Sequence, residues 1–185
     1  MIALKNNLIL IFDTNIFLLG IDFNVIDGVI YTTPKVIDEV KHKRYTNKNR
    51  NIVNRIQAAI ESKKLQLQTP SNKSIQEIDI NSKTTGDYKS LSLVDIELIA
   101  LAFELKLTLK REVILYTNDY SMQNLCSALN ISYSPLIRNG IKSRIIWEVY
   151  CPFCNETKTV EEFGQDCEIC GTRLRRRRKN EINLM

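Results

Sequence analysis

Three short runs of apolar residues stand out in the N-terminal two thirds of the chain. They cover residues 8–12, 29–31 and 113–116, and none contains a charged side chain. A run without polar alternation is typical of a strand buried on both faces, as in the middle of a parallel sheet. The pattern therefore predicts an α/β fold in which a parallel sheet lies between helices.

Helical patterns separate these strands. Thr33 before Pro34 is a helix-start signal, with the hydroxyl residue as N-cap and the proline in the first turn. The polar stretch 70–92 is expected to be a long connection with one short helix at 74–80. The other expected elements are a short helix or loop at 16–27, helices at 52–63, 92–106 and 121–129, and short strands at 65–68 and 131–133.

The first apolar run ends on Asp13, which Thr14 and Asn15 follow. Ligands of open α/β sheets bind beyond the carboxyl ends of the central strands. Asp13 therefore lies where a site is expected. All three residue types also cap helices, so a purely structural role stays open.

Glu39 is the second candidate carboxylate. On a helical wheel Asp38 lies opposite the apolar stripe of the helix that begins at Pro34, whereas Glu39 lies near the edge of that stripe. Glu39 is thus expected to point toward the body of the protein. The alternative is a surface ion pair with Lys43, four residues further on.

Two more carboxylates stand near helix starts. Asp95 falls among apolar residues of the 92–106 helix, and an acid on an apolar face is costly unless something neutralises it. Asp119 follows the third buried strand, two residues after Thr117. Each has a structural alternative, because Asp95 can form a capping box with Ser92 and Asp119 can cap the next helix.

Four carboxylates at one end of a parallel sheet raise one another's pKa unless cations intervene. Hard oxygen ligands without His or Cys suit Mg²⁺ or Mn²⁺. Such ions activate water and stabilise the charge that develops on a phosphodiester. A phosphatase with an Asp nucleophile would need a second Asp two positions after Asp13, where Asn15 stands. The pattern favours metal-dependent phosphodiester hydrolysis.

The C-terminal part carries two Cys-x-x-Cys motifs, with twelve residues between them. This pattern strongly indicates a tetrahedral structural zinc site in a ribbon of two hairpins. Gly171 suits the tight turn of the second motif. Redox-active thiols are the weaker alternative, because a thioredoxin-like context is missing. The expected zinc ligands are Cys151, Cys154, Cys167 and Cys170.

Two basic segments are candidate RNA contacts. Residues 41–55 hold six Lys or Arg and no acid, and residues 175–179 are all basic. The second segment is expected to be a tail without fixed structure until RNA binds. The alternatives are a solvated face and a solubilising tail. The residues selected for phosphate contact are Lys41, Lys43, Arg44, Lys48, Arg50, Arg175, Arg176, Arg177 and Arg178.

Length and composition limit the possible partners, location and domain organisation of the protein. The chain has 185 residues, 44% of them hydrophobic, with a net charge of +5, which permits but does not require a nucleic-acid partner. A run of eighteen apolar residues and a signal-like N-terminus are both missing, so a cytoplasmic protein is expected. The length suits one domain and a small module. The expected divisions are 1–135 for the nuclease domain, 136–146 for a linker, 147–174 for the ribbon and 175–185 for the tail.

These motifs together resemble the PIN-domain family. The resemblance rests on Asp13-Thr14-Asn15, Glu39 after a Thr-Pro helix start, Leu91-Ser92 with Asp95, and Thr117-x-Asp119. It implies a metal-dependent endoribonuclease acting on single-stranded RNA. Asp13, Asp95 and Asp119 would bind the catalytic ion. Glu39 would bind a second ion or position water, and Asn15 and Thr117 would support the site through hydrogen bonds.

A PIN domain followed by a zinc ribbon resembles the archaeal Nob-type nucleases of ribosome assembly. The runs Thr85-Gly86-Asp87 and Asp119-Tyr120-Ser121-x-Gln123-Asn124 add to this resemblance. It implies cleavage of precursor small-subunit rRNA at its 3′ end, in contact with pre-ribosomal particles and with other assembly factors. Asn118 departs from the family, which often has Asp there, and this puts a second ion site in doubt.

Two other functions stay open. One is a non-catalytic RNA-binding assembly factor that uses the PIN fold as a platform; a metal titration would separate it from an enzyme. The other is a PIN toxin that cuts tRNA, which would leave the zinc ribbon unexplained.

Overall fold

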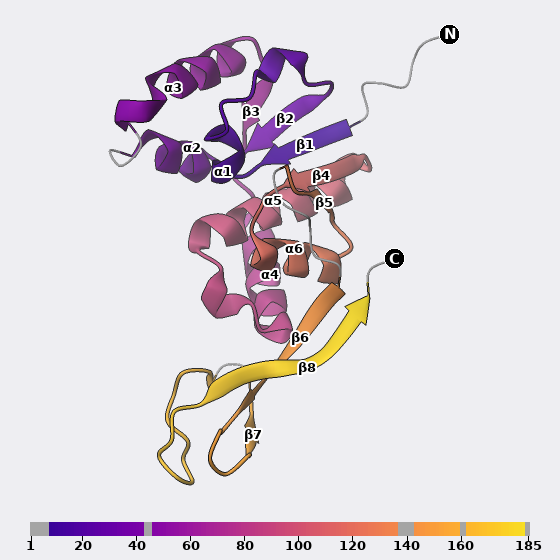
Figure 1. Cartoon of the computed structure of the whole chain (residues 1–185). Helices are drawn as coiled ribbons and strands as arrows, with labels where there is room; N and C mark the ends of the chain where they lie inside the picture. The colour runs from indigo at the N-terminus through magenta and orange to yellow at the C-terminus, as the bar shows by residue number, and fades with distance from the viewer. Residues whose placement is uncertain (1–7, 43–45, 137–142, 160–161, 184–185) are drawn as a thin grey trace.

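The computed structural model describes residues 8–42, 46–136, 143–159 and 162–183, and Figure 1 shows the whole chain. A five-stranded parallel sheet forms the body. Its strands are β1 (Leu8–Phe12), β2 (Val29–Thr32), β3 (Leu65–Leu67), β4 (Glu112–Tyr116) and β5 (Ser132–Ser134), in the order β3-β2-β1-β4-β5. The predicted α/β class with a parallel sheet between helices is confirmed.

Helices flank this sheet (Figure 1). They are α1 (Thr14–Phe17), α2 (Pro34–Lys41), α3 (Thr46–Glu61), α4 (Asn72–Thr85), α5 (Leu93–Leu109) and α6 (Tyr120–Ala128), with 3-10 turns η1 (Phe23–Val25) and η2 (Tyr88–Ser90). The hydroxyl of Thr33 accepts a hydrogen bond from the amide of Val36, so the predicted start of α2 is confirmed. Across the described residues no helix is both long and apolar enough to span a membrane.

The central strand explains why the acids meet at one edge. β1 pairs with β2 on one side and β4 on the other, and its residues Ile9 to Phe12 are buried. Phe12 stands opposite Tyr116 in the register, so Asp13 and Thr117 both come one residue past the sheet. The backbone amide of Asp13 still donates to the carbonyl of Tyr116 at 3.2 Å. Parallel strands thus deliver both residues to the same edge.

The expectation for residues 70–92 is wrong in the extent of the helix. The short helix expected at 74–80 lies within α4, which covers most of this stretch. Ser71 caps its start and Gly86 ends it in the left-handed conformation. The buried face of α4 holds Ser74 and Ser82 beside Ile78, so it lacks a clear apolar stripe. Ser74 is satisfied by a hydrogen bond of 2.7 Å to Glu104 of α5. The sequence pattern underestimated the length of the helix because small polar side chains form part of its packing face.

The C-terminal module is a three-stranded antiparallel sheet with the order β7-β6-β8. Its strands are β6 (Ser143–Tyr150), β7 (Thr157–Lys158) and β8 (Arg175–Asn183). β6 begins within the expected linker, and β8 pairs with it from Arg175 to Asn183. The expectation of an unstructured basic tail is therefore wrong for residues 175–183. Alternation along β8 places Arg175 and Arg177 on one face and Arg176 and Arg178 on the other.

Candidate functional site

Asp13 is the most buried of the candidate acids, with 4% of its surface exposed. Its Oδ2 accepts hydrogen bonds from the hydroxyl of Thr117 at 3.0 Å and from the amide of Asn15 at 3.4 Å. Burial raises the pKa of Asp13 to about 6, against the effect of the Thr117 hydrogen bond, and the neighbouring charge of Asp95 adds to the rise. A carboxylate in this setting favours a bound cation or a proton.

Thr117 connects two of the acids. Its hydroxyl donates to Asp13 and accepts a hydrogen bond from the backbone amide of Asp119 at 3.1 Å. The side chain is fully buried. This one hydroxyl therefore fixes the end of β1 relative to the start of α6. Thr117 and Asn15 thus both donate side-chain hydrogen bonds to Asp13.

Asp95 forms the capping box that was the structural alternative. Its Oδ2 accepts from the amide of Ser92 at 2.8 Å, and the hydroxyl of Ser92 accepts from the amide of Asp95 at 3.2 Å. Burial raises the pKa of Asp95 against these hydrogen bonds, and the charges of Asp119 and Glu39 raise it further. Asp95 is thus both a cap and an electrostatic neighbour of three candidate acids.

Asp119 likewise caps its helix. Its Oδ1 accepts hydrogen bonds from the amides of Ser121 at 2.7 Å and Met122 at 3.1 Å. Both bonds use the same carboxylate oxygen. The cap holds the carboxylate at the start of α6 in one orientation.

Glu39 is exposed on α2 and accepts a hydrogen bond of 2.7 Å from the hydroxyl of Thr14, the residue after Asp13. The structure therefore ties Glu39 to the β1 edge. The alternative ion pair involves Lys43, which lies outside the described residues. Asp38 beside it is exposed as well.

The four acids come from separate segments, and Asp95 interacts electrostatically with each of the other three. They do not form a closed cage. In the described ranges, the four cysteines are the only group of three or more His, Cys, Asp or Glu ligand atoms that all lie within 4.8 Å of one another. The oxygen-only donors and the buried charge of Asp13 fit a hard divalent cation. That chemistry, rather than a preformed cage, supports a metal site.

Sequence reasoning missed Asp87 as a member of this region. Asp87 is 3% exposed, accepts a hydrogen bond of 2.6 Å from the amide of Asn124 on α6, and interacts electrostatically with Asp119. Its only signal was the run Thr85-Gly86-Asp87. Asn118 accepts from the backbone amide of Leu136 at 3.2 Å, so it ties down the segment after β5.

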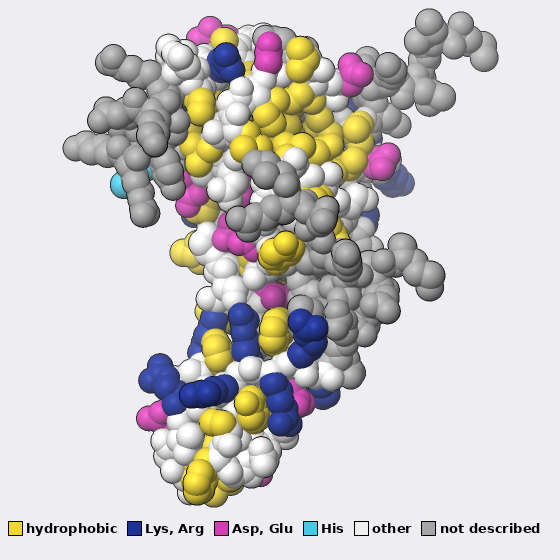
Figure 2. Space-filling model, in the orientation of Figure 1, with side chains coloured by type: hydrophobic (Ala, Val, Ile, Leu, Met, Phe, Trp, Pro, Cys, Tyr) yellow, Lys and Arg dark blue, Asp and Glu magenta, His cyan; other side chains and the backbone are white. Residues whose placement is uncertain are grey.

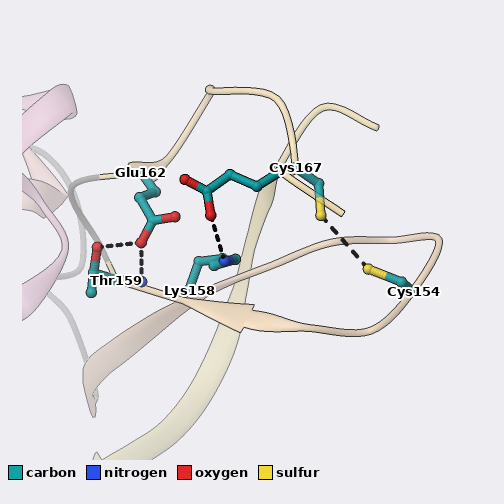
Figure 3. Close-up of polar contacts among 6 residues, drawn as sticks. Cys154, Lys158, Thr159, Glu162 and Cys167 are labelled. Atoms are coloured by element: carbon teal, nitrogen blue, oxygen red, sulfur yellow. Dashed lines mark hydrogen bonds and ion pairs between the residues drawn. The ribbon is translucent and has the colours of Figure 1, made fainter. Parts of the chain in front are cut away.

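The four C-terminal cysteines converge at the end of the ribbon. Cys151 and Cys170 have sulfurs 3.4 Å apart, Cys154 and Cys167 3.7 Å, and Cys154 and Cys170 3.9 Å. Figure 3 shows the Cys154 and Cys167 side chains pointing toward each other. Tetrahedral zinc with bonds of about 2.3 Å needs sulfurs about 3.8 Å apart. These distances fit one zinc ion with four protein ligands, which leaves no open position for catalysis.

The two cysteine motifs have matching turns. The amide of Asn155 donates to the carbonyl of Cys151, and that of Gly171 donates to the carbonyl of Cys167. Asn155 and Gly171 both have positive φ, 59° and 71°. Gly and Asn are the residues that adopt this conformation at least cost. Polar contacts brace the loop between the motifs, with Thr159 bound to Glu162 and Lys158 paired with Glu168 (Figure 3).

The structure describes the side chains of only some of the candidate RNA contacts. Lys41 is exposed at the end of α2. Lys43 and Arg44 lie outside the described residues, as do the side chains of Lys48 and Arg50 in α3. Figure 2 shows Lys and Arg side chains gathered where β8 crosses beneath the body. Arg177 pairs with Glu148 at 2.7 Å, Arg175 and Arg178 are exposed, and Arg176 is half-buried.

Comparison with known families defines the class. Residues 10–105 match the family described as the PIN domain of ribonuclease. This segment contains α2 and most of β1 and α5, and with them Asp13, Glu39 and Asp95. PIN domains are metal-dependent nucleases.

Known relatives extend the match into the ribbon. Endoribonuclease Nob1 of Pyrococcus abyssi is 34% identical over 88% of this chain and 89% of its own length. Endoribonuclease Nob1 of Methanocaldococcus jannaschii is 30% identical over 90% of this chain and 76% of its own length. The 20S-pre-rRNA D-site endonuclease NOB1 of Saccharomyces cerevisiae is 37% identical over 79 residues, which are 43% of this chain and 16% of that protein. The chain belongs to the Nob1 family of PIN-domain endoribonucleases.

The raised pKa of Asp13 leads to a stability prediction. The folded protein binds its proton more tightly than the unfolded chain does, so the stability that Asp13 contributes falls as pH rises from about 4 through about 6. Asp13→Asn keeps a hydrogen-bond acceptor and removes the charge. In zinc-loaded protein without Mn²⁺ or Mg²⁺, we expect the variant to be more stable at pH 7 by up to about 3 kcal/mol and about equally stable at pH 4.

Urea unfolding of both proteins across this pH range measures the difference, and the zinc ligands titrate equally in both. A variant less stable than the wild type at pH 7 would contradict the burial argument.

The zinc site leads to a second prediction. Trp147, the only tryptophan, lies on β6 and packs against β8 and Gly86. Loss of zinc should unfold the ribbon, because a module this small depends on its metal. Cys167→Ser should lower the zinc content and shift the Trp147 fluorescence to longer wavelength. Phe153→Ser is the matched control, since Phe153 is an exposed non-ligand in the first cysteine motif. Unchanged emission in Cys167→Ser would argue against a structural zinc.

Proposed function

We propose that this protein is a metal-dependent endoribonuclease that cleaves single-stranded RNA, with precursor small-subunit rRNA cut at its 3′ end during ribosome assembly. The observation that carries the proposal is the set of hydrogen bonds that ties acids from separate segments to the carboxyl edge of the sheet. Thr117 bonds to the carboxylate of Asp13 and to the backbone amide of Asp119, and Thr14 bonds to Glu39. Asp95 interacts electrostatically with all three acids. The name of the yeast relative, a 20S-pre-rRNA D-site endonuclease, supports the choice of substrate. Such a function places the protein in the cytoplasm, in contact with pre-ribosomal particles and other assembly factors.

Asp13, Asp95 and Asp119 are the residues that would hold Mn²⁺ or Mg²⁺. Bound there, the ion would activate a water molecule and offset the charge developing on the phosphate. Asp119 and Asp95 use Oδ1 and Oδ2 respectively for helix caps, which orients each carboxylate before any ligand arrives. That orientation reduces the reorganisation needed when RNA binds.

Glu39 occupies a different position in this proposal. It is exposed, and its Oε2 is held by Thr14 next to Asp13. From there it either contributes to a second ion or positions the attacking water and takes its proton. The oxygen of water forms a bond to phosphorus while the bond between phosphorus and the 3′ oxygen breaks. The leaving 3′ oxygen takes up a proton, so the products have 5′-phosphate and 3′-hydroxyl ends.

One observation favours the rival function, an RNA-binding assembly factor without catalysis. Asp95 and Asp119 both have a structural role in capping helices, which would explain their presence without catalysis. A platform of this kind would bind RNA in the presence of Mn²⁺ and leave it intact. Cleavage that rises with the Mn²⁺ concentration would exclude the rival.

Removal of single charges tests the catalytic assignment. Asp119→Asn keeps a good helix cap, and Asp13→Asn keeps an acceptor for Thr117, so both should fold. We expect each to lower cleavage with Mn²⁺ by about 100-fold or more, since metal ligation contributes several kcal/mol to the transition state. The measurement is cleavage of an RNA that spans the 3′ end of the small-subunit precursor, with mapped products.

Asp38→Asn is the matched control. It removes the same charge from α2, one residue from Glu39, at an exposed position. Its rate should stay within about twofold of the wild type. Undiminished cutting by both Asp13→Asn and Asp119→Asn would refute the proposed mechanism.

RNA contact by the basic strand predicts a salt dependence. The logarithm of the affinity for single-stranded RNA should fall linearly with the logarithm of the salt concentration. Arg175 is exposed on β8, and Arg175→Ala should reduce the steepness of this line by about 0.7 if Arg175 neutralises one phosphate. Filter binding in the absence of Mn²⁺ and Mg²⁺ measures both. An affinity that is indifferent to salt would rule out the assignment of this surface.

A further inference from the structure

Arg176 differs from the other arginines of β8 because aromatic rings enclose it. Its guanidinium carbon lies 4.6 Å from the centre of the Trp147 ring and 5.6 Å from that of Phe163. The planar guanidinium stacks on aromatic faces in this range of distances. Trp147 comes from β6 and Phe163 from the loop between the cysteine motifs. Arg176 therefore connects parts of the ribbon that are distant in sequence.

The same guanidinium reaches the nuclease body. Its Nη1 donates to the carbonyl of Gly86 at 3.4 Å and to the hydroxyl of Ser90 at 3.3 Å. Both acceptors belong to residues 86–92, here named the α4–α5 loop. Lys89 of this loop adds a second contact, with its ammonium 5.0 Å from the centre of the Phe163 ring. Each part therefore supplies a cation to the other: Arg176 of the ribbon contacts the α4–α5 loop, and Lys89 of the loop contacts Phe163 of the ribbon.

Gly86 shows how closely the two parts fit. Its φ is +83°, and a Cβ atom built there would lie 2.8 Å from the Cβ of Trp147. The position therefore requires glycine for its backbone conformation and for the contact with the ribbon. This gives a physical reason for the glycine in the run Thr85-Gly86-Asp87.

The α4–α5 loop continues into the candidate site. Asp87, next to Gly86, is buried and accepts the 2.6 Å hydrogen bond from Asn124 on α6, the helix that Asp119 caps. At its other end the loop reaches Ser92, which forms the capping box with Asp95. A shift of this loop would therefore change the positions of two of the four carboxylates, Asp119 and Asp95.

We propose that Arg176 is a positioning residue that locks the zinc ribbon onto the α4–α5 loop, so that RNA held by the ribbon meets the carboxylates in a fixed register. The effect on cleavage rests on the proposed function, whereas the lock itself is a property of the protein without RNA. Arg175 and Arg177 lie on the opposite face of β8. One face of the basic strand thus holds the ribbon in place, and the other is the proposed RNA contact.

The first test uses hydrogen exchange in the zinc-loaded full chain without RNA. Arg176→Ala should speed amide exchange in the α4–α5 loop and the first turn of α6 by about tenfold or more, because these amides lose a neighbouring anchor. Arg175→Ala is the matched control: it removes the same charge from the adjacent position and should leave exchange at these amides unchanged. Zinc content, measured on every variant, shows whether the ribbon stays folded.

Arg176→Lys and Gly86→Ala extend the test. Lysine keeps the charge but lacks the planar fork, so it should speed exchange at the same amides as alanine does. Gly86→Ala leaves Arg176 in place and should give the same pattern by displacing Trp147. Exchange at wild-type rates in Arg176→Ala with full zinc content would overturn the lock.

Cleavage supplies the second test. With saturating RNA and Mn²⁺, Arg176→Ala and Arg176→Lys should both lower kcat by about tenfold, with a smaller change in KM, because a misplaced substrate reacts slowly. If Arg176 only contacts RNA, Arg176→Ala would instead raise KM, and Arg176→Lys would keep the activity of the wild type. That result would overturn the positioning role. If the wild type cleaves nothing, the proposed function fails, and the exchange measurements still decide whether the lock exists.

Discussion

The hydrogen bond from Thr117 to Asp13 joins residues 104 positions apart, and the candidate site depends on it. Burial of a carboxylate at the end of the central strand costs the fold free energy at neutral pH. The hydroxyl of Thr117 offsets part of this cost, and it also accepts a hydrogen bond from the backbone amide of Asp119. One buried side chain therefore sets how far the end of β1 lies from the start of α6.

The other acids show that a structural role and a chemical role can coincide. Asp95 and Asp119 each direct one carboxylate oxygen at backbone amides of a helix start. Those amides carry partial positive charge, which reduces the repulsion between carboxylates held close together. Helix capping was the alternative to a site role for both residues, yet it is also the means by which the fold holds them in place.

Much of this arrangement was predictable from the sequence, for reasons that are local. The apolar run of β1, the Thr33-Pro34 start of α2 and the paired cysteine motifs each carry their signal within a few residues. The length of helix α4 was underestimated because its buried face includes Ser74 and Ser82, and Ser74 is satisfied by Glu104, thirty residues further on. Asp87 was missed for the same reason, since its importance comes from Asn124 and the nearby Asp119.

Strand β8 shows why charge alone is a poor guide to a basic segment. Five consecutive basic residues suggest a solvated tail, but a strand places alternate side chains on opposite faces. One face then supplies Arg176 to the rings of Trp147 and Phe163, while Arg177 on the other face stacks on Tyr150 and pairs with Glu148. The surrounding aromatic rings and a carboxylate accommodate charges that would otherwise favour an extended, mobile chain. The same arginine run therefore presents exposed positive charge and also holds the ribbon against the α4–α5 loop.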